Sequence, residues 1–383
     1  MCMINSILIL GGHIQALGLA RQCKAKGLYV VVLTDDKCSV ARWSCAVDKT
    51  YFYRTNDELM QKLHTLASKE SLLFPTSDDY IDFIVAYRNE LEDLYMIALP
   101  DNEIVALFAD KRLTYQFAEK HKIDHPASQY PNSWANVGEI ADKITYPCVV
   151  KPAVMYSFHK QFGKKAFLCK DKEDLLARCR TIEQGDFPID KLVIQEFLDG
   201  GAKNLYSFGT FAVNGESMVD IQVNRLRQNP MTFGNSTTYC VTCDVPEITE
   251  AAKRILALTH YTGMGEVEFM YDKGEYKFLE INTRAWKWHT ISNQRGFSFI
   301  GAWIDTLNGK PSDAIDRNTN VAWMEHLTDS AVSLKEIIHR RIGVGEWLRT
   351  RWHEHERAVW SWRDPLPAIM YLMLSPILYI KRY

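Results

Sequence analysis

The sequence has 383 residues, of which 47% are hydrophobic and 12% are aromatic. A chain of this length and composition can bury more than one core, which excludes a disordered protein and predicts two or three globular domains. The 45 basic and 47 acidic residues give a formal net charge of −2. No broad positive field therefore exists to attract nucleic acid or anionic lipid, and any basic site must be local.

Residues 1–105 are predicted to form an α/β domain with a Rossmann-like parallel sheet. The runs SILILGG, YVVVLTDD and SLLFPTSDD indicate strands that end in polar turns, and IQALGLARQCKAKG indicates a helix between the first two. This order is typical of parallel βαβ units. Gly11, Gly12 and Gly18 lie where a pyrophosphate would bind, but their spacing departs from GxGxxG. Close packing of helix on strand is the alternative explanation.

After residue 105 the pattern predicts an α+β fold with antiparallel sheets. A helical stretch, DNEIVALFADKRLTYQFAEKHKIDHPAS, precedes short strand-like runs: YPCVVKPAV, KKAFLC, KLVIQEFL, NLYSFGTFAVNG, ESMVDIQVNRLR and TTYCVTC. Helices are expected at KEDLLARCRTIEQ and EITEAAKRILALTHYTG. The turn signal NGKPSD near residue 310 precedes a helical extension. We expect domains over residues 1–105, 106–190, 191–310 and 311–383.

Three polar side chains alternate in the strand-like run KFLEINTRAWKWHT, residues 277–290. Glu280, Asn282 and Arg284 are spaced by two, so in a strand they project from one face. The preceding DKG, residues 272–274, is expected to be a three-residue hairpin loop with glycine in the left-handed position.

This loop pairs Glu268 with Phe278, and Glu266 with Glu280, so Glu280 lies diagonal to Glu268 on one face with Glu266 as a third acid. Burying like charges together costs several kcal/mol unless a cation shares the site. Oxygen ligands favour a hard ion, so Glu268, Glu280 and Asn282 are candidate ligands of Mg²⁺, with Mn²⁺ as an alternative. A solvated face whose acids pair with the following arginine is the other interpretation.

The cysteines and the two ends of the chain bear on location. Nine scattered cysteines, an odd number, suit a reducing compartment, and Cys240 and Cys243 are expected to be structural because no second pair accompanies them. The N-terminus shows no signal peptide, so we expect a cytoplasmic protein. The apolar tail from Leu366 is too short to span a bilayer. It is either a helix packed on the body or an interfacial anchor with Lys381 and Arg382 at the headgroups.

The motifs between Asp110 and His289 resemble those of the ATP-grasp ligases in order and spacing. Glu268-Phe269, Glu280-Ile281-Asn282 and Arg284 are similar to the metal-binding hairpin of that family, and the resemblance covers Asp110 to His289. The runs NLYSFGTF, RLRQ and EINTRAWKWH resemble most closely the D-aspartate ligase-like carboxylate-amine ligases. The resemblance implies an ATP-grasp fold with a small lobe over residues 106–190 and a large lobe over residues 191–310.

The resemblance also implies a nucleotide site. Lys111 and Lys151 are similar to paired lysines that hold ATP phosphates, and IQEFL, residues 194–198, looks like the hinge that binds adenine. The lid MYSFHKQFGKK has a single glycine where the family has several, so its lysines are expected to replace backbone amides. The implied ATP-binding residues are Lys111, Lys151, Lys164, Gln195, Glu196, Phe197, Leu198 and Asn204.

The implied activity is an ATP- and Mg²⁺-dependent ligase that joins a carboxylate to an amine through an acyl-phosphate. Arg225 and Arg227 are spaced by two and are candidates for binding phosphate or carboxylate, with Arg284 stabilising the oxyanion. The segment Ser77–Asp79, after a strand, could hold the amine or cap a helix. The expected substrates are small molecules, an amino acid and a cell-envelope precursor. A bicarbonate-using carboxylase and a catalytically silent nucleotide-binding protein are the alternatives.

Overall fold

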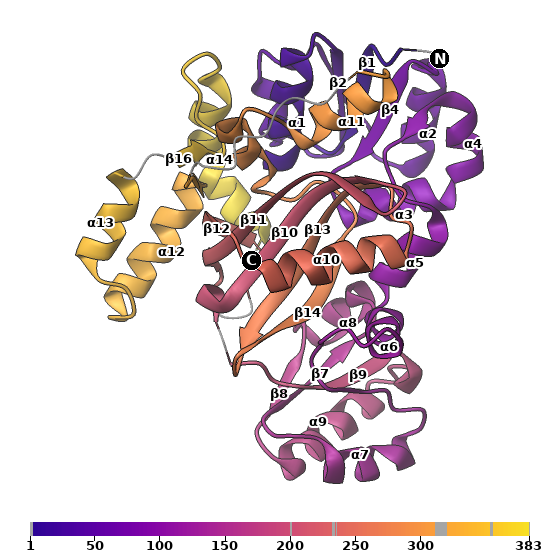
Figure 1. Cartoon of the computed structure of the whole chain (residues 1–383), viewed down its shortest axis with the longest axis vertical. Helices are drawn as coiled ribbons and strands as arrows, with labels where there is room; N and C mark the ends of the chain where they lie inside the picture. The colour runs from indigo at the N-terminus through magenta and orange to yellow at the C-terminus, as the bar shows by residue number, and fades with distance from the viewer. Residues whose placement is uncertain are drawn as a thin grey trace. The chain divides into compact units, whose positions relative to one another are not determined.

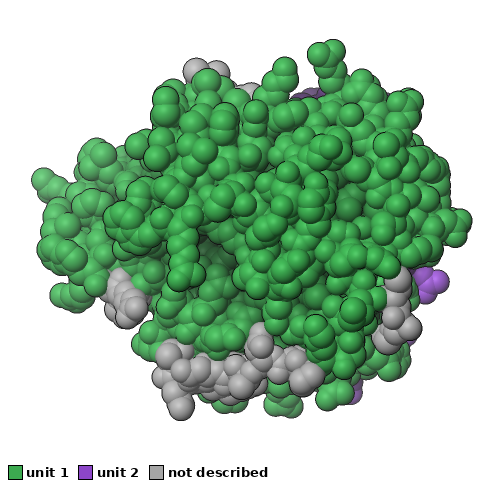
Figure 2. Space-filling model, turned by 90° about the horizontal axis from the view of Figure 1, so that it is seen from above, with its two compact units in different colours: residues 1–101, 201–266, 282–383 green, residues 102–200, 267–281 purple. Residues whose placement is uncertain are grey.

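The computed structural model describes residues 3–199, 201–231, 234, 236–310, 320–352 and 355–382, without the side chains of 155–157 and 378–382. The chain forms two compact units, which Figure 2 distinguishes by colour. Unit 1 comprises residues 1–101, 201–266 and 282–383, and unit 2 comprises residues 102–200 and 267–281. Segments far apart in the sequence therefore build unit 1.

The N-terminal part of unit 1 is the predicted parallel sheet, with strand order β3-β2-β1-β4-β5. Its strands are β1 Ser6–Leu10, β2 Tyr29–Thr34, β3 Lys49–Phe52, β4 Ser71–Pro75 and β5 Met96–Ile97. The helices of this part are α1 Ile14–Ala25, α2 Asn56–Thr65, α3 Asp78–Ala86 and α4 Arg88–Leu94, with a 3₁₀ turn η1 Ala41–Trp43. The direction of the strand order reverses between β1 and β4, where the carboxyl ends of parallel strands leave room for a ligand.

The N-terminal glycines serve close packing. Gly11 has a φ of +101°, and a Cβ there would lie 2.2 Å from Thr76 Oγ1. A Cβ on Gly18, in α1, would lie 2.5 Å from Thr290 Cγ2. Protein atoms thus already contact the positions considered for a pyrophosphate, which favours the packing explanation.

A seven-stranded sheet, with strand order β14-β13-β10-β11-β12-β15-β16, follows in the chain. Its strands are β10 Leu205–Val213, β11 Glu216–Asn229, β12 Ser236–Cys243, β13 Gly263–Asp272, β14 Glu275–Asn282, β15 Ala322–Met324 and β16 His355–Arg357. The helices of this part are α10 Pro246–Leu258, α11 Phe299–Leu307, α12 His326–Ile338, α13 Val344–Trp352 and α14 Leu366–Arg382, with 3₁₀ turns η4 Ala202–Asn204 and η5 His289–Arg295.

Helices cover both faces of β10 and β11 (Figure 1). Val219, Ile221 and Val223 are buried in one core with α11, whereas Gln222, one position out of phase, donates to Val245 O (3.1 Å) at the start of α10. Because side chains alternate along a strand, α10 and α11 pack on opposite faces.

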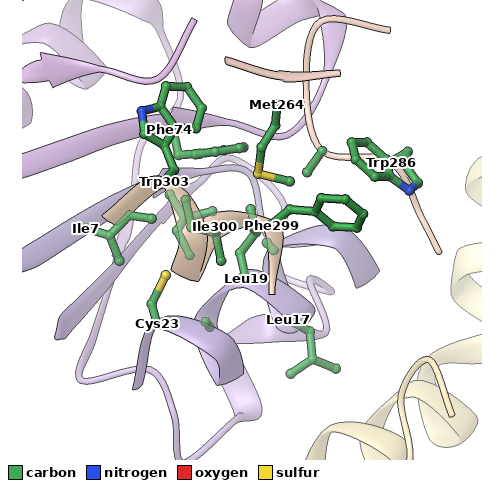
Figure 3. Packing of buried hydrophobic residues seen from close by; sticks show 14 of the residues in the cluster. Ile7, Leu17, Leu19, Cys23, Phe74, Met264, Trp286, Phe299, Ile300 and Trp303 are labelled. Carbon is green, nitrogen blue, oxygen red and sulfur yellow. The ribbon is translucent and has the colours of Figure 1, made fainter. Parts of the chain in front are cut away.

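One core joins the N-terminal part of unit 1 to the large sheet. Leu17 and Leu19 of α1, Phe74 of β4, and Trp303 of α11 belong to the same buried cluster, part of which Figure 3 shows. The Trp303 ring packs edge-on against Phe74, with 6.1 Å between ring centroids. The aromatic residues that follow β14 are also buried: Trp286 and Trp288 are 1% exposed. These parts are therefore held rigidly together by apolar burial.

Unit 2 is built on an antiparallel sheet with strand order β6-β9-β7-β8. Its strands are β6 Ser128–Gln129, β7 Cys148–Pro152, β8 Phe167–Cys169 and β9 Leu192–Glu196. Its helices are α5 Asn102–Ala109, α6 Lys111–Lys120, α7 Val137–Lys143, α8 Met155–Phe162 and α9 Lys172–Gln184, with 3₁₀ turns η2 Trp134–Asn136 and η3 Ile189–Lys191. The expected combination of a parallel α/β sheet with antiparallel sheets is confirmed.

The sequence predicts a helical C-terminal extension, but the structure also contains two short strands there. The short strands β15 and β16 add to the edge of the large sheet next to β12. Three-residue strands carry too little periodicity to be recognised in a sequence. None of the helices in the described residues has the length and apolar character needed to cross a membrane.

Candidate active site

Lys111 of unit 2 forms an ion pair with Glu280. It is the first residue of α6, where Asp110 caps the helix by accepting from the Arg112 and Leu113 N–H groups. Its ammonium lies 2.6 Å from Glu280 Oε2. Burial would lower the pKa of Lys111, but the charges of Glu280 and Glu268 outweigh burial and raise it. One acid of the predicted metal group, Glu280, therefore pairs directly with this cation.

Lys165, rather than Lys164, is the lid lysine associated with this group. Burial lowers the pKa of Lys165, and the nearby charge of Glu280 opposes that change. Lys164 instead lies over the Phe167 ring, 5.5 Å from its centroid. The glycine-poor lid segment forms helix α8, which ends at Gly163 in the left-handed conformation. Its first three side chains lie outside the described residues.

The hairpin that carries these acids has a tighter loop than predicted. β13 extends to Asp272 and β14 begins at Glu275, so the loop contains two residues, Lys273 and Gly274, both with positive φ. Tyr271 and Tyr276 pack ring on ring, with 4.9 Å between centroids. The predicted three-residue loop and its register at this end are therefore wrong by one residue. Lysine in the left-handed conformation permits this turn, and the sequence alone gave no sign of it.

Glu280 lies at a half-buried position of β14. Phe278 and Ile281 are buried, and two half-buried residues, Leu279 and Glu280, lie between them. From this position the Glu280 carboxylate reaches the Lys111 ammonium.

Glu266 does not join the acids, contrary to the expectation of a third carboxylate. It is 4% exposed, and its carboxylate accepts from Trp288 Nε1 (2.7 Å) and Asn282 Nδ2 (3.1 Å). Within the described residues, no group of three His, Cys, Asp or Glu side chains is arranged to hold a metal by itself. Carboxylates such as Glu268 and Glu280 suit an ion that takes its remaining oxygen ligands from phosphate and water.

Lys151 holds a charge that no acid in the described residues neutralises. It follows the buried Val149 and Val150 on β7, and its ammonium donates to Gln195 Oε1 (2.7 Å) and Tyr115 Oη (3.1 Å). Its partners are therefore neutral oxygens. A half-buried ammonium with only neutral partners is poised to bind an anion.

Gln195 supports Lys151 instead of facing outward. It is 4% exposed, and its Nε2 donates to Ser128 Oγ (2.7 Å) while its Oε1 holds the lysine. Both ends of the amide are thus used inside unit 2. The predicted contact of Gln195 with an adenine amino group does not agree with this arrangement, because Lys151 and Ser128 fix its orientation.

The hinge after β9 leaves one backbone donor available. The Glu196 N–H donates to Ala127 O and the Phe197 N–H to Pro147 O. The Leu198 N–H has no acceptor among the residues that the structure describes. The Glu196 carboxylate accepts from Lys277 Nζ at 2.6 Å. Burial would raise the pKa of Glu196, but Lys277 and the Ala127 N–H outweigh it and lower the pKa.

Arg284 of unit 1 forms an ion pair with Asp78, which belongs to the segment predicted to hold the amine. Its Nε lies 2.6 Å from Asp78 Oδ1 and its Nη2 lies 3.3 Å from Asp78 Oδ2. Asp78 is the first residue of α3, directly after β4 and Ser77. The structure thus brings Arg284 and the start of α3 together within unit 1, as a fork-like charged pair.

Arg227 is bound inside unit 1 and is not available for a phosphate. It is 4% exposed, and Asp329 of α12 accepts from its Nε (2.8 Å) and Nη2 (3.0 Å). The Tyr239 ring lies 4.2 Å below the guanidinium. The proposed catalytic role of Arg227 therefore disagrees with its surroundings. Arg225 is also buried, and its charge acts on the Cys240 thiol.

Two other candidates have ordinary structural surroundings. Asn204 ends η4, where its N–H donates to Gly201 O (3.3 Å). Cys240 is fully buried in β12, and burial raises its pKa, so it remains a thiol. The structural role expected for Cys240 agrees with this position.

A cavity of about 640 Å³ opens within unit 1 at the carboxyl ends of the parallel strands. Ser77 and Asp79 line it, as the sequence suggested. Ser77 precedes α3 with extended backbone but makes no side-chain cap bond, so the capping alternative is not supported. Further lining residues are His13, Gln15, Asp35, Asp36, Tyr53, Arg54, Tyr80, Ser236, Lys287 and Tyr371.

The cavity carries charges of both signs. Tyr53 Oη donates to Tyr80 Oη (2.7 Å), which in turn donates to Asp35 Oδ1 (3.5 Å). Burial raises the pKa of Tyr53 to about 12, so the phenol stays protonated. Lys287 lies 3.3 Å from Glu325 Oε2 and also donates to Ser236 Oγ. The lining can hold an ammonium beside the aspartates and an anion beside Lys287.

Comparison of the sequence with known protein families and proteins agrees with this architecture. The profile of the ATP-grasp domain matches residues 108–286. D-aspartate ligase of Enterococcus faecium (strain Aus0004) is 24% identical over 310 residues, which cover 74% of this chain and 73% of the relative. The similarity to the ATP-grasp domain thus covers residues 108–286 of this chain.

Solved structures share this ATP-grasp fold. N5-carboxyaminoimidazole synthetase from Staphylococcus aureus matches with a TM-score of 0.67 at 15% identity, covering 89% of this chain and 87% of that one. The biotin carboxylase domain of the 2-oxoglutarate carboxylase from Hydrogenobacter thermophilus, in complex with MgADP, ADP and bicarbonate, matches with a TM-score of 0.64 at 16% identity, covering 83% and 72%.

The sequence did not point to part of the lining of the unit 1 cavity. Asp35 and Asp36 are expected from the sequence to form a polar turn after β2, although their place at the carboxyl end of a parallel strand could have marked them. Lys287 and Tyr371 gave no such signal, because they reach the cavity from distant segments.

Proposed function

We propose that this protein is an ATP- and Mg²⁺-dependent ligase that joins a carboxylate to an amine and releases ADP and phosphate. The observation that carries the proposal is the arrangement of charge in unit 2. The Glu280 carboxylate pairs with the Lys111 ammonium, while Lys151 has only neutral partners among the described residues. Acids for a divalent ion and a cation for phosphate oxygens are what a metal–triphosphate requires.

Lys111 and Lys151 bind phosphate oxygens of ATP in this proposal, and the Leu198 N–H binds the adenine edge. Glu268, Glu280 and Asn282 are the residues that would hold Mg²⁺, which supplies positive charge to the phosphates. Lys165 replaces Lys164 as the lid cation, because Glu280 acts on its charge. Gln195 has the supporting role of orienting Lys151.

The reaction proceeds in two balanced steps. A carboxylate oxygen of the first substrate attacks the γ-phosphorus, the bond to the β-phosphate oxygen breaks, and ADP leaves. The amine then attacks the acyl carbon of the acyl-phosphate, loses a proton, and expels phosphate as the amide forms. Arg284 stabilises the oxyanion of this second step. Arg225 contributes positive charge, and Arg227 has a structural role.

The unit 1 cavity receives the substrates in this proposal. The amine, as an ammonium ion, binds beside Asp35 and Asp79, and a substrate carboxylate binds near Lys287. An amino acid and an amine of a cell-envelope precursor are the proposed pair, by similarity to the D-aspartate ligase relative. We place the reaction in the cytoplasm.

ADP release tests the proposal. Purified protein is incubated with ATP and Mg²⁺ and with panels of amino acids and amines, and the coupled product is identified by mass. ADP should form in proportion to an amide product, and the double variant Glu280→Ala/Asn282→Ala should abolish it. Turnover that requires bicarbonate and gives no amide would favour a carboxylase. Tight ATP binding without ADP formation on any panel would favour a silent nucleotide-binding protein.

The cavity has its own test. Asp79→Asn should raise the KM for the amine about ten-fold or more while leaving the KM for ATP unchanged, because one charge-assisted contact is lost. Asp82→Asn is the matched control, since Asp82 is an exposed acid of the same helix that does not line the cavity. Equal effects of the two substitutions would contradict the assignment of the cavity.

A further inference from the structure

Helix α14 has one face packed on the protein and another that is exposed and wholly apolar. Ala368 and Tyr371 pack against the core of unit 1, and Tyr371 also lines the 640 Å³ cavity. The other face consists of Leu366, Ile369, Leu372, Met373 and Ile377, which are 45%, 46%, 62%, 68% and 46% exposed. The two interpretations of the tail are therefore compatible, because the helix packs on the body and still presents an apolar face.

The spacing shows that this face is one continuous stripe. Positions 366, 369, 373 and 377 differ by three or four residues, which places their side chains one above another on a helix. Trp362, just before the helix, is 82% exposed and extends the apolar surface. Single exposed apolar residues are ordinary, but a contiguous stripe of this length marks an interaction surface.

The charged residues that adjoin the stripe along the sequence are basic, apart from the buried Asp364. Arg363 precedes α14 and is exposed, and Lys381 and Arg382 lie at its end, with side chains outside those described. The sequence from residue 365 to 383 contains no acidic residue. An apolar face bounded by tryptophan and basic residues is typical of helices that lie in a membrane interface, where the cations meet anionic headgroups.

The same charges disfavour a second copy of this chain as the occupant. In a symmetric antiparallel contact, the end with Arg363 of one helix would meet the end with Lys381 and Arg382 of the other. Like charges would then face one another at both ends.

We propose that α14 docks this protein on an anionic membrane surface, with Leu366, Ile369, Leu372, Met373 and Ile377 inserted at the headgroup–acyl boundary. This inference does not depend on the proposed ligase function. Since Tyr371 on the opposite side of α14 lines the unit 1 cavity, docking would hold that cavity close to the membrane surface.

Vesicle flotation of the full chain tests the proposal. Vesicles of phosphatidylcholine with phosphatidylglycerol should float the protein at low salt, and pure phosphatidylcholine vesicles should float much less. The double variant Leu372→Gln/Met373→Gln should reduce the bound fraction about ten-fold or more, because two side chains lose apolar burial. Both residues are highly exposed, so the fold should persist, and thermal unfolding checks this.

A matched control is Met218→Gln/Leu258→Gln, which changes exposed apolar residues of β11 and α10 that are 43% and 39% exposed. This variant should bind vesicles like the unchanged protein. Failure of the unchanged protein to float with anionic vesicles would overturn the proposal. A lipid-free dimer that the Leu372→Gln/Met373→Gln variant dissociates would also overturn it, because the stripe would then be covered by a second copy.

Discussion

Lys111 Nζ lies 2.6 Å from Glu280 Oε2, so the ammonium pairs with a carboxylate that is a candidate ligand of a metal ion. Burial would lower the pKa of Lys111, but the charge of Glu280, with smaller contributions from Tyr115 and Glu268, raises it. In the proposed function the lysine must exchange one carboxylate partner for a phosphate when nucleotide and ion bind. Its charge is then needed in both states, at different atoms.

Replacement of Lys111 by methionine should lower kcat/KM for ATP about 100-fold or more, because a charge-assisted contact to phosphate is lost. The same variant should bind Mg²⁺ or Mn²⁺ without nucleotide more tightly, since no ammonium competes for Glu280. Steady-state kinetics and Mn²⁺ titration by electron paramagnetic resonance measure the two effects. Lys120→Met, at the other end of α6, should change neither.

The pair of Arg284 and Asp78 should matter for catalysis and little for stability. Asp78 is 77% exposed, and an exposed ion pair is worth about 0–1 kcal/mol. Arg284→Lys keeps the charge but loses the planar fork, so kcat should fall about 100-fold while the free energy of unfolding changes by less than about 1 kcal/mol. A stability loss large enough to account for the activity loss would show that the pair only holds the fold.

The buried pair of Arg227 and Asp329 should behave in the opposite way. Removing only the carboxylate with Asp329→Ala leaves a guanidinium that is 4% exposed without its partner, which should cost about 3–5 kcal/mol in urea unfolding. The double variant Arg227→Met/Asp329→Leu should recover most of that loss. If the folded double variant lost phosphoryl transfer while keeping its stability, Arg227 would regain the catalytic role first considered for it.

The contrast between these two arginines shows what the sequence could predict. The spacing by two in NRLRQ and in EINTR identified both as candidates for binding an anion, because such spacing is local information. The partner that decides the role of Arg227 lies 102 residues further along the chain. No local pattern links NRLRQ to Asp329 in α12, so its burial could not be foreseen.

The same distinction applies to the fold. Long strands such as β11 and β10, and the lysine that ends VVK, have strong periodicity or an unusual charge in an apolar run, and they were found where predicted. The register of the β13–β14 hairpin depended on Lys273 adopting a φ of 49°, a choice that composition does not reveal. The unit 1 cavity depended on tertiary packing, which brings Lys287 and Tyr371 to the ends of parallel strands.

Stability should fall as the pH is lowered from about 6.5 to 4. Burial lowers the pKa of His289 from 6.5 to about 4, and the ring is fully buried. In this range the unfolded chain binds a proton that the folded chain excludes, so the free energy of unfolding rises with pH and is constant above the unfolded pKa. The lowered pKa of His289 alone accounts for at most about 3 kcal/mol of this change in the free energy of unfolding. Burial and the neighbouring His355 also lower the pKa of His326 to about 4. His326 therefore adds a second proton to the difference between the unfolded and folded chains.

Urea unfolding at a series of pH values separates the two histidines. His289→Asn should reduce the slope of unfolding free energy against pH by about one proton between pH 6.5 and 4, whatever it does to stability at pH 7. His326→Asn should remove the second proton in the same way. His64 is the control, because it lies at the surface, with its side chain 49% exposed. If His289→Asn left the slope unchanged, the imidazole must be protonated inside the fold, and its contact with Gln15 O at 3.2 Å would have to stabilise the charged form.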